Sequence, residues 1–230
     1  TRIKLVKSID VRWSDVTLAD AEISLYKSVL NSGIQYNVIH LLSGQDLPLK
    51  SQNYIHKFFC IHQLEEFIDI ADIPQTKRRL KFYHLFVRNR RNNVMIDFLR
   101  RLLLIPQLLF VNRLKKSPFV FAYGSEWCSL SYMAVKEIVH KYEEYRFMFK
   151  YTTCCDEHYK QMILVSNPKF KISPMGNLRF IIFDKGTPSP HVLKETDYQA
   201  MTLSECLFAR KFDIRIDKNV VNKILCNLKK

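Results

Sequence analysis

The strongest constraint on the fold is the alternation of short apolar runs with helical segments along almost the whole chain. Residues 38–42 and 178–183 are apolar runs of strand length, and further strands are expected at residues 2–7 and 213–217. Helices are predicted from Asp15 or Thr17 to Gly33, from Ser51, near 132–145, near 156–164, near 195–203 and from Lys218. This order predicts an α/β fold, a layered domain with a mostly parallel sheet.

Length and cysteine usage narrow the class of protein. The 230 residues, 47% of them hydrophobic, are enough to bury a core without disulfides, and no repeat or low-complexity linker divides them. A single domain over residues 1–230 is therefore predicted. The six cysteines form no C-x-x-C pair, which argues against a zinc ribbon or a redox pair and favours a reduced, cytosolic compartment. No apolar run approaches the roughly 20 residues that span a bilayer, and residues 1–30 lack the layout of a signal peptide.

The positive charge is concentrated in one window. The chain carries 36 Lys and Arg against 22 Asp and Glu, a net charge of +14. Twelve of the basic residues lie between Lys77 and Lys116, where Asp97 is the only acid, so this window holds +11. Apolar residues interrupt the basic ones at helical spacing, with Pro106 as a break, which predicts a basic amphipathic excursion of one or two helices over about 88–116.

Three interpretations of this excursion are open. Its apolar face can enter the headgroup boundary of a membrane while its arginines meet anionic lipid. Alternatively, the apolar face packs on the domain and the charges are only solvated. The third interpretation is nucleic-acid binding through residues 77–116, which is weakened because the window has few aromatic residues for base stacking and no recognised binding motif. No nucleic-acid partner is expected.

Three short motifs carry candidate chemistry, each with a plainer structural alternative. Asp46 follows a predicted strand, where ligands bind in α/β sheets, but it can simply cap a turn. Glu157 lies in a predicted first helical turn, where carboxylates are favoured, and can act as a general base if it faces a cleft. Arg210 and Lys211 stand between aromatic residues and suit a diphosphate, although a surface ion pair is an equally simple role.

Other common sites are not indicated. The run from Cys154 to His158 suggests a metal cluster at first, but no second ligand pair stands at a zinc-like spacing, so no metal site is predicted. The P-loop and dinucleotide fingerprints are absent from the sequence. No Asp-x-Asp occurs either, so a metal-bridged nucleotide-sugar site would lack its usual carboxylates.

Taken in order, these segments resemble the core-2/I-branching β-1,6-N-acetylglucosaminyltransferase family, glycosyltransferase family 14, which includes the peptide O-xylosyltransferases. The resemblance implies a GT-A-like fold, a UDP-sugar donor, inversion at the anomeric carbon, and neither a metal nor another cofactor. The matching stretches are Trp13 with the helix that follows, the run LLSGQDLPLKS at 41–51, GSEWCSLS at 124–131, DEH at 156–158, LRF at 178–180 and LFARKFD at 207–213.

The resemblance also assigns roles to individual residues. Glu157 matches the catalytic glutamate and inherits the role of general base, with Cys154-Cys155 in place of the Ser-Pro that usually precedes the Asp-Glu pair. Lys211, together with Arg210, would stabilise the charge on the departing UDP. A second cation reaches the diphosphate in animal members, and the nearest position here is Lys194.

Acceptor contacts in the family come partly from basic residues before a tyrosine. Arg78 is the nearest counterpart, with Arg79 and Tyr83 as neighbours. Trp127 and Phe183 are aromatic positions that can stack on a sugar or on uracil, or pack in the core. Asp46 is a further candidate for hydrogen bonds from hydroxyl groups.

Two departures from the family shape the functional expectation. The chain starts after the family's N-terminal strand-helix-strand unit, so part of the donor site is expected upstream, and the excursion at 88–116 is unlike animal members. We therefore expect a bacterial-type enzyme of polysaccharide biosynthesis, cytoplasmic and peripheral at the inner face of the cell membrane. It would transfer N-acetylglucosamine or xylose to a glycan or lipid-linked saccharide. The alternative is a non-catalytic module that binds membranes or nucleic acid through residues 77–116.

Overall fold

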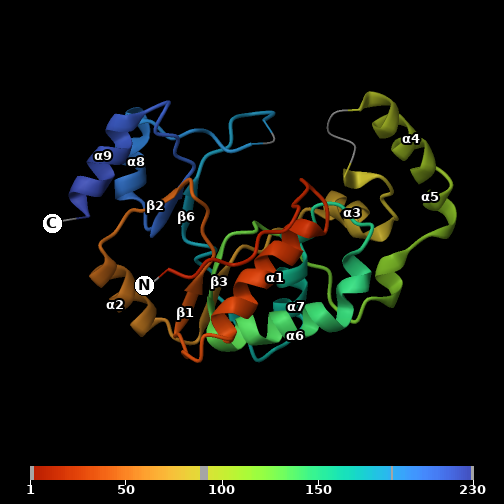
Figure 1. Cartoon of the computed structure of the whole chain (residues 1–230), viewed down its shortest axis with the longest axis horizontal. Helices are drawn as coiled ribbons and strands as arrows, with labels where there is room; N and C mark the ends of the chain where they lie inside the picture. Colours follow the sequence, from red (N-terminus) through yellow and green to blue (C-terminus); the bar gives the residue numbers. More distant parts are fainter. Residues whose placement is uncertain (1–2, 89–92, 188, 229–230) are drawn as a thin grey trace.

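The computed structural model describes residues 3–88, 93–187 and 189–228. Most of the helices pack around two small sheets, whereas α4 and α5 lie at one end of the longest axis (Figure 1). The α-helices are α1 (Thr17–Leu30), α2 (Gln52–Ile61), α3 (Lys77–Lys81), α4 (Val94–Leu104), α5 (Gln107–Phe110), α6 (Tyr132–Phe149), α7 (Tyr159–Val165), α8 (Tyr198–Leu203) and α9 (Lys218–Asn227). Short 3-10 helices are η1 (Pro74–Thr76), η3 (Arg113–Lys116), η4 (Cys155–Glu157) and η5 (Glu195–Asp197).

The strands form two mixed sheets. One sheet has the order β1-β4-β3-β5 and the other has the order β2-β7-β6. In the first, β4 is antiparallel to β1 and β3, and β3 is parallel to β5; in the second, β7 is antiparallel to β2 and parallel to β6. The strands are β1 (Val38–His40), β2 (Asp46–Pro48), β3 (Glu65–Ile68), β4 (Cys128–Ser131), β5 (Lys171–Ile172), β6 (Arg179–Ile181) and β7 (Phe208–Arg210).

The α/β fold class is confirmed, but the expectation of a mostly parallel sheet is wrong for the described strands. Strand direction depends on the connections, and the chain that leaves β3 returns at the same end of the sheet to begin β4. Ile68, the last residue of β3, is paired with Cys128, the first residue of β4. This return places the residues that follow β3 beside those that precede β4.

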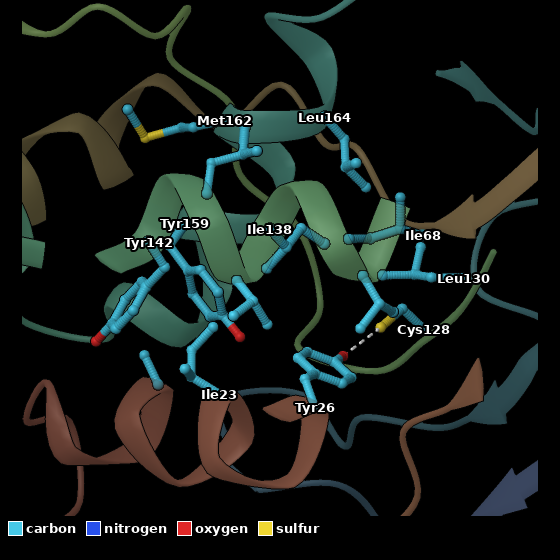
Figure 2. Packing of buried hydrophobic residues seen from close by; sticks show 14 of the residues in the cluster. Ile23, Tyr26, Ile68, Cys128, Leu130, Ile138, Tyr142, Tyr159, Met162 and Leu164 are labelled. Atoms are coloured by element: carbon cyan, nitrogen blue, oxygen red, sulfur yellow. Dashed lines mark hydrogen bonds between the residues drawn. The ribbon is translucent and has the colours of Figure 1, made fainter. Parts of the chain in front are cut away.

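The main core lies between the first sheet and helices α1, α6 and α7. Figure 2 shows side chains of this core, in which residues from the two strands β3 and β4 meet residues from all three helices. The labelled residues, all buried, are Ile23, Tyr26, Ile68, Cys128, Leu130, Ile138, Tyr142, Tyr159, Met162 and Leu164. A second, smaller core joins the other sheet to α8 and α9.

Several helix ends follow the sequence signals. The Ser51 side chain accepts a hydrogen bond from the Tyr54 amide and caps α2, as predicted. Gly33 follows α1 with a φ of +74°, a conformation that favours glycine. The Asp217 side chain likewise caps α9 by accepting from the Val220 amide.

Two expected strands do not form. Residues 3–12 have no regular structure, and they pair with no strand among the described residues. Residues 213–217 form a turn instead, because the Asp213 carbonyl accepts from the amides of Ile216 and Asp217.

The excursion at 88–116 forms helices as predicted. No residue of α4 or α5 is fully buried. Most of their apolar side chains are exposed, whereas Ile96, Leu103 and Leu104 are half-buried. The alternative in which the apolar face packs on the domain therefore holds for only a minority of the described apolar side chains. Within the described part of the chain, no helix combines the length and apolar character needed to cross a bilayer.

Candidate functional site

A cavity of about 830 Å³ brings together most of the motifs from the sequence. Its walls come from the segments next to β3 and β4, from η4, and from β6 and β7. Glu157, Trp127 and Arg210 all line it, although they are far apart in the sequence. The antiparallel pairing of β3 with β4 places the wall formed after β3 beside the wall formed before β4.

The position of Glu157 depends on a close backbone contact at Gly124. A methyl group on Gly124 would lie 1.8 Å from the carbonyl oxygen of Asp69, so only glycine fits there. The Gly124 amide donates to the Glu157 carbonyl at 3.0 Å. The glycine of the GSEWC motif thus fixes the loop before β4 against both β3 and η4.

Glu157 is the carboxylate best placed for proton transfer. Arg79 of α3 donates from Nη1 to Glu157 Oε2, and its guanidinium lies 5.5 Å from the centre of the Tyr123 ring. Burial raises the pKa of Glu157, while the Arg79 charge opposes that rise. The result is a carboxylate that is a stronger base than an exposed glutamate and is held in a fixed orientation.

Two further carboxylates surround Glu157. Carboxylate oxygens of Glu126, Asp156 and Glu157 lie within 4.8 Å of one another. Burial, with the charges of Glu22, Glu126 and Glu157, raises the pKa of Asp156 to about 8. Asp156 is buried, and its Oδ1 has no hydrogen-bond partner among the described residues. This trio is the group of described residues whose geometry could hold a metal ion, but Glu157 is already paired with a cation, and the raised pKa of Asp156 disfavours its charged form.

Arg210 supplies positive charge to the same cavity. Its guanidinium carbon lies 3.8 Å from the centre of the Trp127 ring, and only 8% of the residue is exposed. Within the part of the chain that the structure describes, its Nε and Nη1 have no hydrogen-bond partner, and Asp46 Oδ1 lies 3.7 Å from Nε. A buried guanidinium with free donors is ready to bind an oxyanion.

The other predicted donor residue lies at the rim. Lys211 does not line the cavity, but its Nζ donates at 2.7 Å to Ser189 Oγ, and Ser189 does line it. Lys194 is exposed and also lies outside the lining, although the amide of Leu193 beside it donates to the Lys211 carbonyl.

Asp46 takes the plainer of its two expected roles. Its carboxylate accepts from the Ser43 amide at 2.9 Å and from Ser43 Oγ at 2.8 Å, closing the turn at 43–46. The side chain is fully buried and does not line the cavity. Its position therefore supports contact with Arg210 rather than with a sugar hydroxyl.

Only some of the residues predicted to contact the acceptor line the cavity. Trp127 and Phe183 line the cavity. Arg78 is exposed and does not line it. Tyr83 lies elsewhere, under the Arg113 guanidinium at 4.4 Å and beside a separate cavity of about 280 Å³. The basic residue that reaches the site is Arg79, the neighbour of the position favoured by the sequence.

Sequence reasoning missed Glu126 and gave Arg79 only a secondary place. Glu126 stands next to Trp127 in the GSEWC run, but a single glutamate before a strand carries no signal of its own. Arg79 is one of three consecutive basic residues, and only the rotation of the short helix α3 decides which of them faces Glu157.

A cavity with a paired base on one wall and a buried cation on another can remove a proton from a bound hydroxyl and stabilise a leaving oxyanion. Comparison of the sequence with protein families finds a match over most of the chain. The family described as Core-2/I-Branching enzyme matches residues 2–206, a range that includes Arg79, Trp127 and Glu157. No curated protein matches the chain.

Proposed function

Because the chain belongs to the Core-2/I-branching enzyme family, a family of glycosyltransferases, we propose that it moves a sugar from a UDP-sugar to a hydroxyl of a glycan or lipid-linked saccharide. N-acetylglucosamine and xylose are the sugars that the resemblance favours. The transfer inverts the anomeric carbon. One observation carries the proposal: Glu157 and Arg210 line a single cavity of about 830 Å³.

The proposed reaction assigns one task to each group. Glu157 takes the proton of the acceptor hydroxyl as its oxygen attacks the sugar C1 opposite the departing diphosphate. The C1–O bond to UDP breaks as the new glycosidic bond forms, and the negative charge passes to the diphosphate. Arg210 from the wall and Lys211 from the rim stabilise that charge. Trp127, which supports Arg210, is the aromatic group best placed to contact the sugar or uracil.

We propose that this charge stabilisation needs no metal ion. Arg210 is a buried cation that lines the cavity, and Lys211 lies next to it in the chain. The carboxylates that might hold a metal are poorly suited to one, because Glu157 is paired with Arg79 and burial raises the pKa of Asp156 to about 8. The cation pair would therefore do the work that a divalent ion does in other nucleotide-sugar enzymes.

We also propose that the enzyme is of bacterial type and works at the inner face of the cell membrane. This placement would suit a lipid-linked saccharide as the acceptor. The support is the excursion at 88–116, which is rich in basic residues and exposes most of the apolar side chains of α4 and α5.

Thermal stabilisation by a panel of nucleotides and UDP-sugars in excess EDTA tests the donor site. A ligand at about 100 times its Kd adds roughly 2.7 kcal/mol to the stability of the protein that binds it. We expect UDP to raise the Tm in EDTA, with one UDP-sugar raising it most. If UDP has no effect in EDTA but stabilises once a divalent ion is added, the metal-free site is wrong.

The variant Glu157→Gln tests the base. Transfer of the sugar should fall on the order of 10²–10⁴-fold, while stabilisation by UDP is retained. Glu205→Gln, at an exposed position outside the cavity, is the matched control and should transfer normally. The rival function, a non-catalytic module binding through 77–116, predicts no transfer by the parent protein with any UDP-sugar.

A further inference from the structure

Helices α4 and α5 expose most of their apolar side chains, while Ile96, Leu103 and Leu104 are half-buried. Two half-buried polar side chains also hold the helices to the domain. Arg100, whose side chain is only 12% exposed, bonds Asp97 and approaches His84 Nδ1 at 3.3 Å. Gln107 donates to the Tyr83 carbonyl at 3.0 Å and accepts from the Tyr83 amide at 2.8 Å.

The other apolar side chains of the same helices are exposed to solvent. Val94, Phe98, Leu102 and Ile105 are spaced four, four and three residues apart along α4 and its C-cap, and so lie along one face. Val94 is 87% exposed and Phe98 67%. We call the exposed set the outer face, and it comprises Val94, Met95, Phe98, Leu99, Leu102, Ile105, Leu108, Leu109 and Phe110.

An outer face of this size indicates a partner, because soluble proteins rarely expose large contiguous apolar patches. Its place in the molecule makes it accessible, since α4 and α5 project at the end of the longest axis (Figure 1). The surface lies apart from the two cores, and no described residue of α4 or α5 is buried.

The charge around the outer face specifies the kind of partner. Asp97 is the single acid between residues 77 and 116, and it is occupied by Arg100 and Arg101. Among the described residues, several exposed or half-buried cations of this window form no ion pair: Lys77, Arg78, Lys81, Lys115 and Lys116. An exposed apolar face flanked in the chain by unpaired cations matches the boundary between acyl chains and anionic headgroups.

We propose that the outer face of α4 and α5 docks on an anionic lipid bilayer, with its apolar side chains in the headgroup boundary and the unpaired cations against lipid phosphates. A second copy of this chain fits less well, because two such faces would bring cationic surfaces together. A nucleic acid would leave the apolar side chains in water.

The docking surface is linked to the cavity through α3, which bears on the proposed function. Arg79 of α3 pairs with Glu157, and the carbonyl of Arg78 lies 3.0 Å from His84 Nε2. The other nitrogen of the His84 ring faces Arg100 of α4. If the proposed function holds, this connection between the base and α4 favours a saccharide on a membrane lipid as the acceptor.

Vesicle cosedimentation tests the surface without relying on catalysis. The protein should bind phosphatidylcholine vesicles that contain phosphatidylglycerol, bind vesicles of phosphatidylcholine alone more weakly, and lose affinity as salt is raised. The triple variant Phe98→Ser, Leu102→Ser, Phe110→Ser removes three exposed apolar side chains from the contact. Its affinity for the anionic vesicles should be lower than that of the parent by a factor of about ten or more.

A matched control removes exposed apolar side chains at the opposite end of the molecule. The control is the triple variant Tyr54→Ser, Ile61→Ser, Leu64→Ser. The three exposed residues lie on or just after α2, which is distant from α4 and α5 (Figure 1). This variant should bind vesicles like the parent. Circular dichroism of both variants should match that of the parent, and a variant that unfolds is replaced by the single change Phe110→Ser, expected to weaken binding in the same direction.

Other results overturn the docking proposal. It fails if the parent does not bind anionic vesicles, or if the outer-face variant binds as well as the parent. It also fails if the parent is a dimer that the outer-face variant converts to a monomer, since a second copy would then cover the face. Glu157→Gln separates the two proposals: it should bind vesicles normally, so loss of the proposed transferase activity leaves the surface unaffected.

Discussion

At the scale of single residues, the pair of Glu157 and Arg79 sets the pH range of the proposed reaction. Glu157 must be ionised to accept a proton. Burial raises its pKa and the Arg79 charge lowers it, so removing Arg79 leaves a larger rise. We expect Arg79→Gln to move the acid limb of the kcat/KM profile to higher pH.

The measurement is the pH dependence of sugar transfer by the parent and the variant. Arg78→Gln is the matched control, because Arg78 is exposed and outside the cavity, and its acid limb should coincide with that of the parent. An acid limb that stays in place in Arg79→Gln would show that Arg79 does not act on the charge of Glu157.

Asp156 gives a prediction about stability. Its pKa is raised to about 8 in the fold by burial and by the charges of Glu22, Glu126 and Glu157, above the ordinary value of 3.8. Between these values the folded state binds more protons than the unfolded state, so the free energy of unfolding falls as pH rises. Asp156→Asn removes this dependence, and it should gain stability relative to the parent as pH rises from about 4 to about 8.

Urea titrations at several pH values measure the effect. Asp72→Asn, at an exposed position, provides the control and should keep the pH dependence of the parent. A constant difference in unfolding free energy between Asp156→Asn and the parent across this range would mean that Asp156 is ionised in the fold at all these pH values.

Some of the site residues, but not all of them, could be predicted from the sequence. Glu157, Trp127 and Arg210 could be named because each belongs to a motif with family-like neighbours. Arg79 could not be chosen over Arg78, because both are arginines in one basic run and the choice depends on which side of α3 faces η4. Asp46 could be identified as a candidate, but its role could not be predicted. A carboxylate that follows a strand can bind a ligand or accept hydrogen bonds that close its own turn.

At the scale of elements, the contact between the loop before β4 and the end of β3 determines the shape of the cavity. Gly124→Ala would place a methyl group 1.8 Å from the Asp69 carbonyl oxygen, and backbone on both sides must move to relieve the clash. We expect a loss of stability of about 2 kcal/mol or more together with weaker transfer, because the Gly124 amide also holds the Glu157 carbonyl.

Gly44→Ala is the control for this change. A methyl group on Gly44 meets no atom within 4 Å, so the Tm should stay close to that of the parent. A Gly124→Ala protein with the stability and the activity of the parent would contradict the close packing of β3 against the loop before β4.

Helices were easier to predict than strands for a physical reason. A cap such as Ser51 and a terminal glycine such as Gly33 act within a few residues, so the sequence contains the whole signal. Strand direction and pairing depend on distant partners. The run at 213–217 therefore resembled a strand although its backbone closes a turn, and the antiparallel pairing of β3 with β4 was not foreseen.

At the scale of the whole molecule, the two sheets form one cavity because a buried arginine joins them. Arg179 lies in β6 of the second sheet. It donates to Ser129 Oγ at 2.7 Å, to the Cys128 carbonyl at 2.5 Å and to the Leu41 carbonyl at 3.2 Å, all in or next to the first sheet. Burial lowers its pKa to about 10, so it stays charged at pH 7.

Arg179→Met tests this connection. Methionine fills similar space but removes the Arg179 donor from the carbonyls of Leu41 and Asn177. Ser129 Oγ keeps its contact with His40, and the Cys128 carbonyl keeps the Leu41 amide. Each unsatisfied buried group costs about 1–3 kcal/mol. We expect the free energy of unfolding in urea to fall by about 2 kcal/mol or more, and stabilisation by UDP to weaken because the cavity walls separate. Arg179→Lys should lie between the two, since an ammonium group cannot reach all of these acceptors with the geometry of the guanidinium. If Arg179→Met keeps the stability of the parent, the sheets are held together by apolar packing, and the cavity would not depend on this residue.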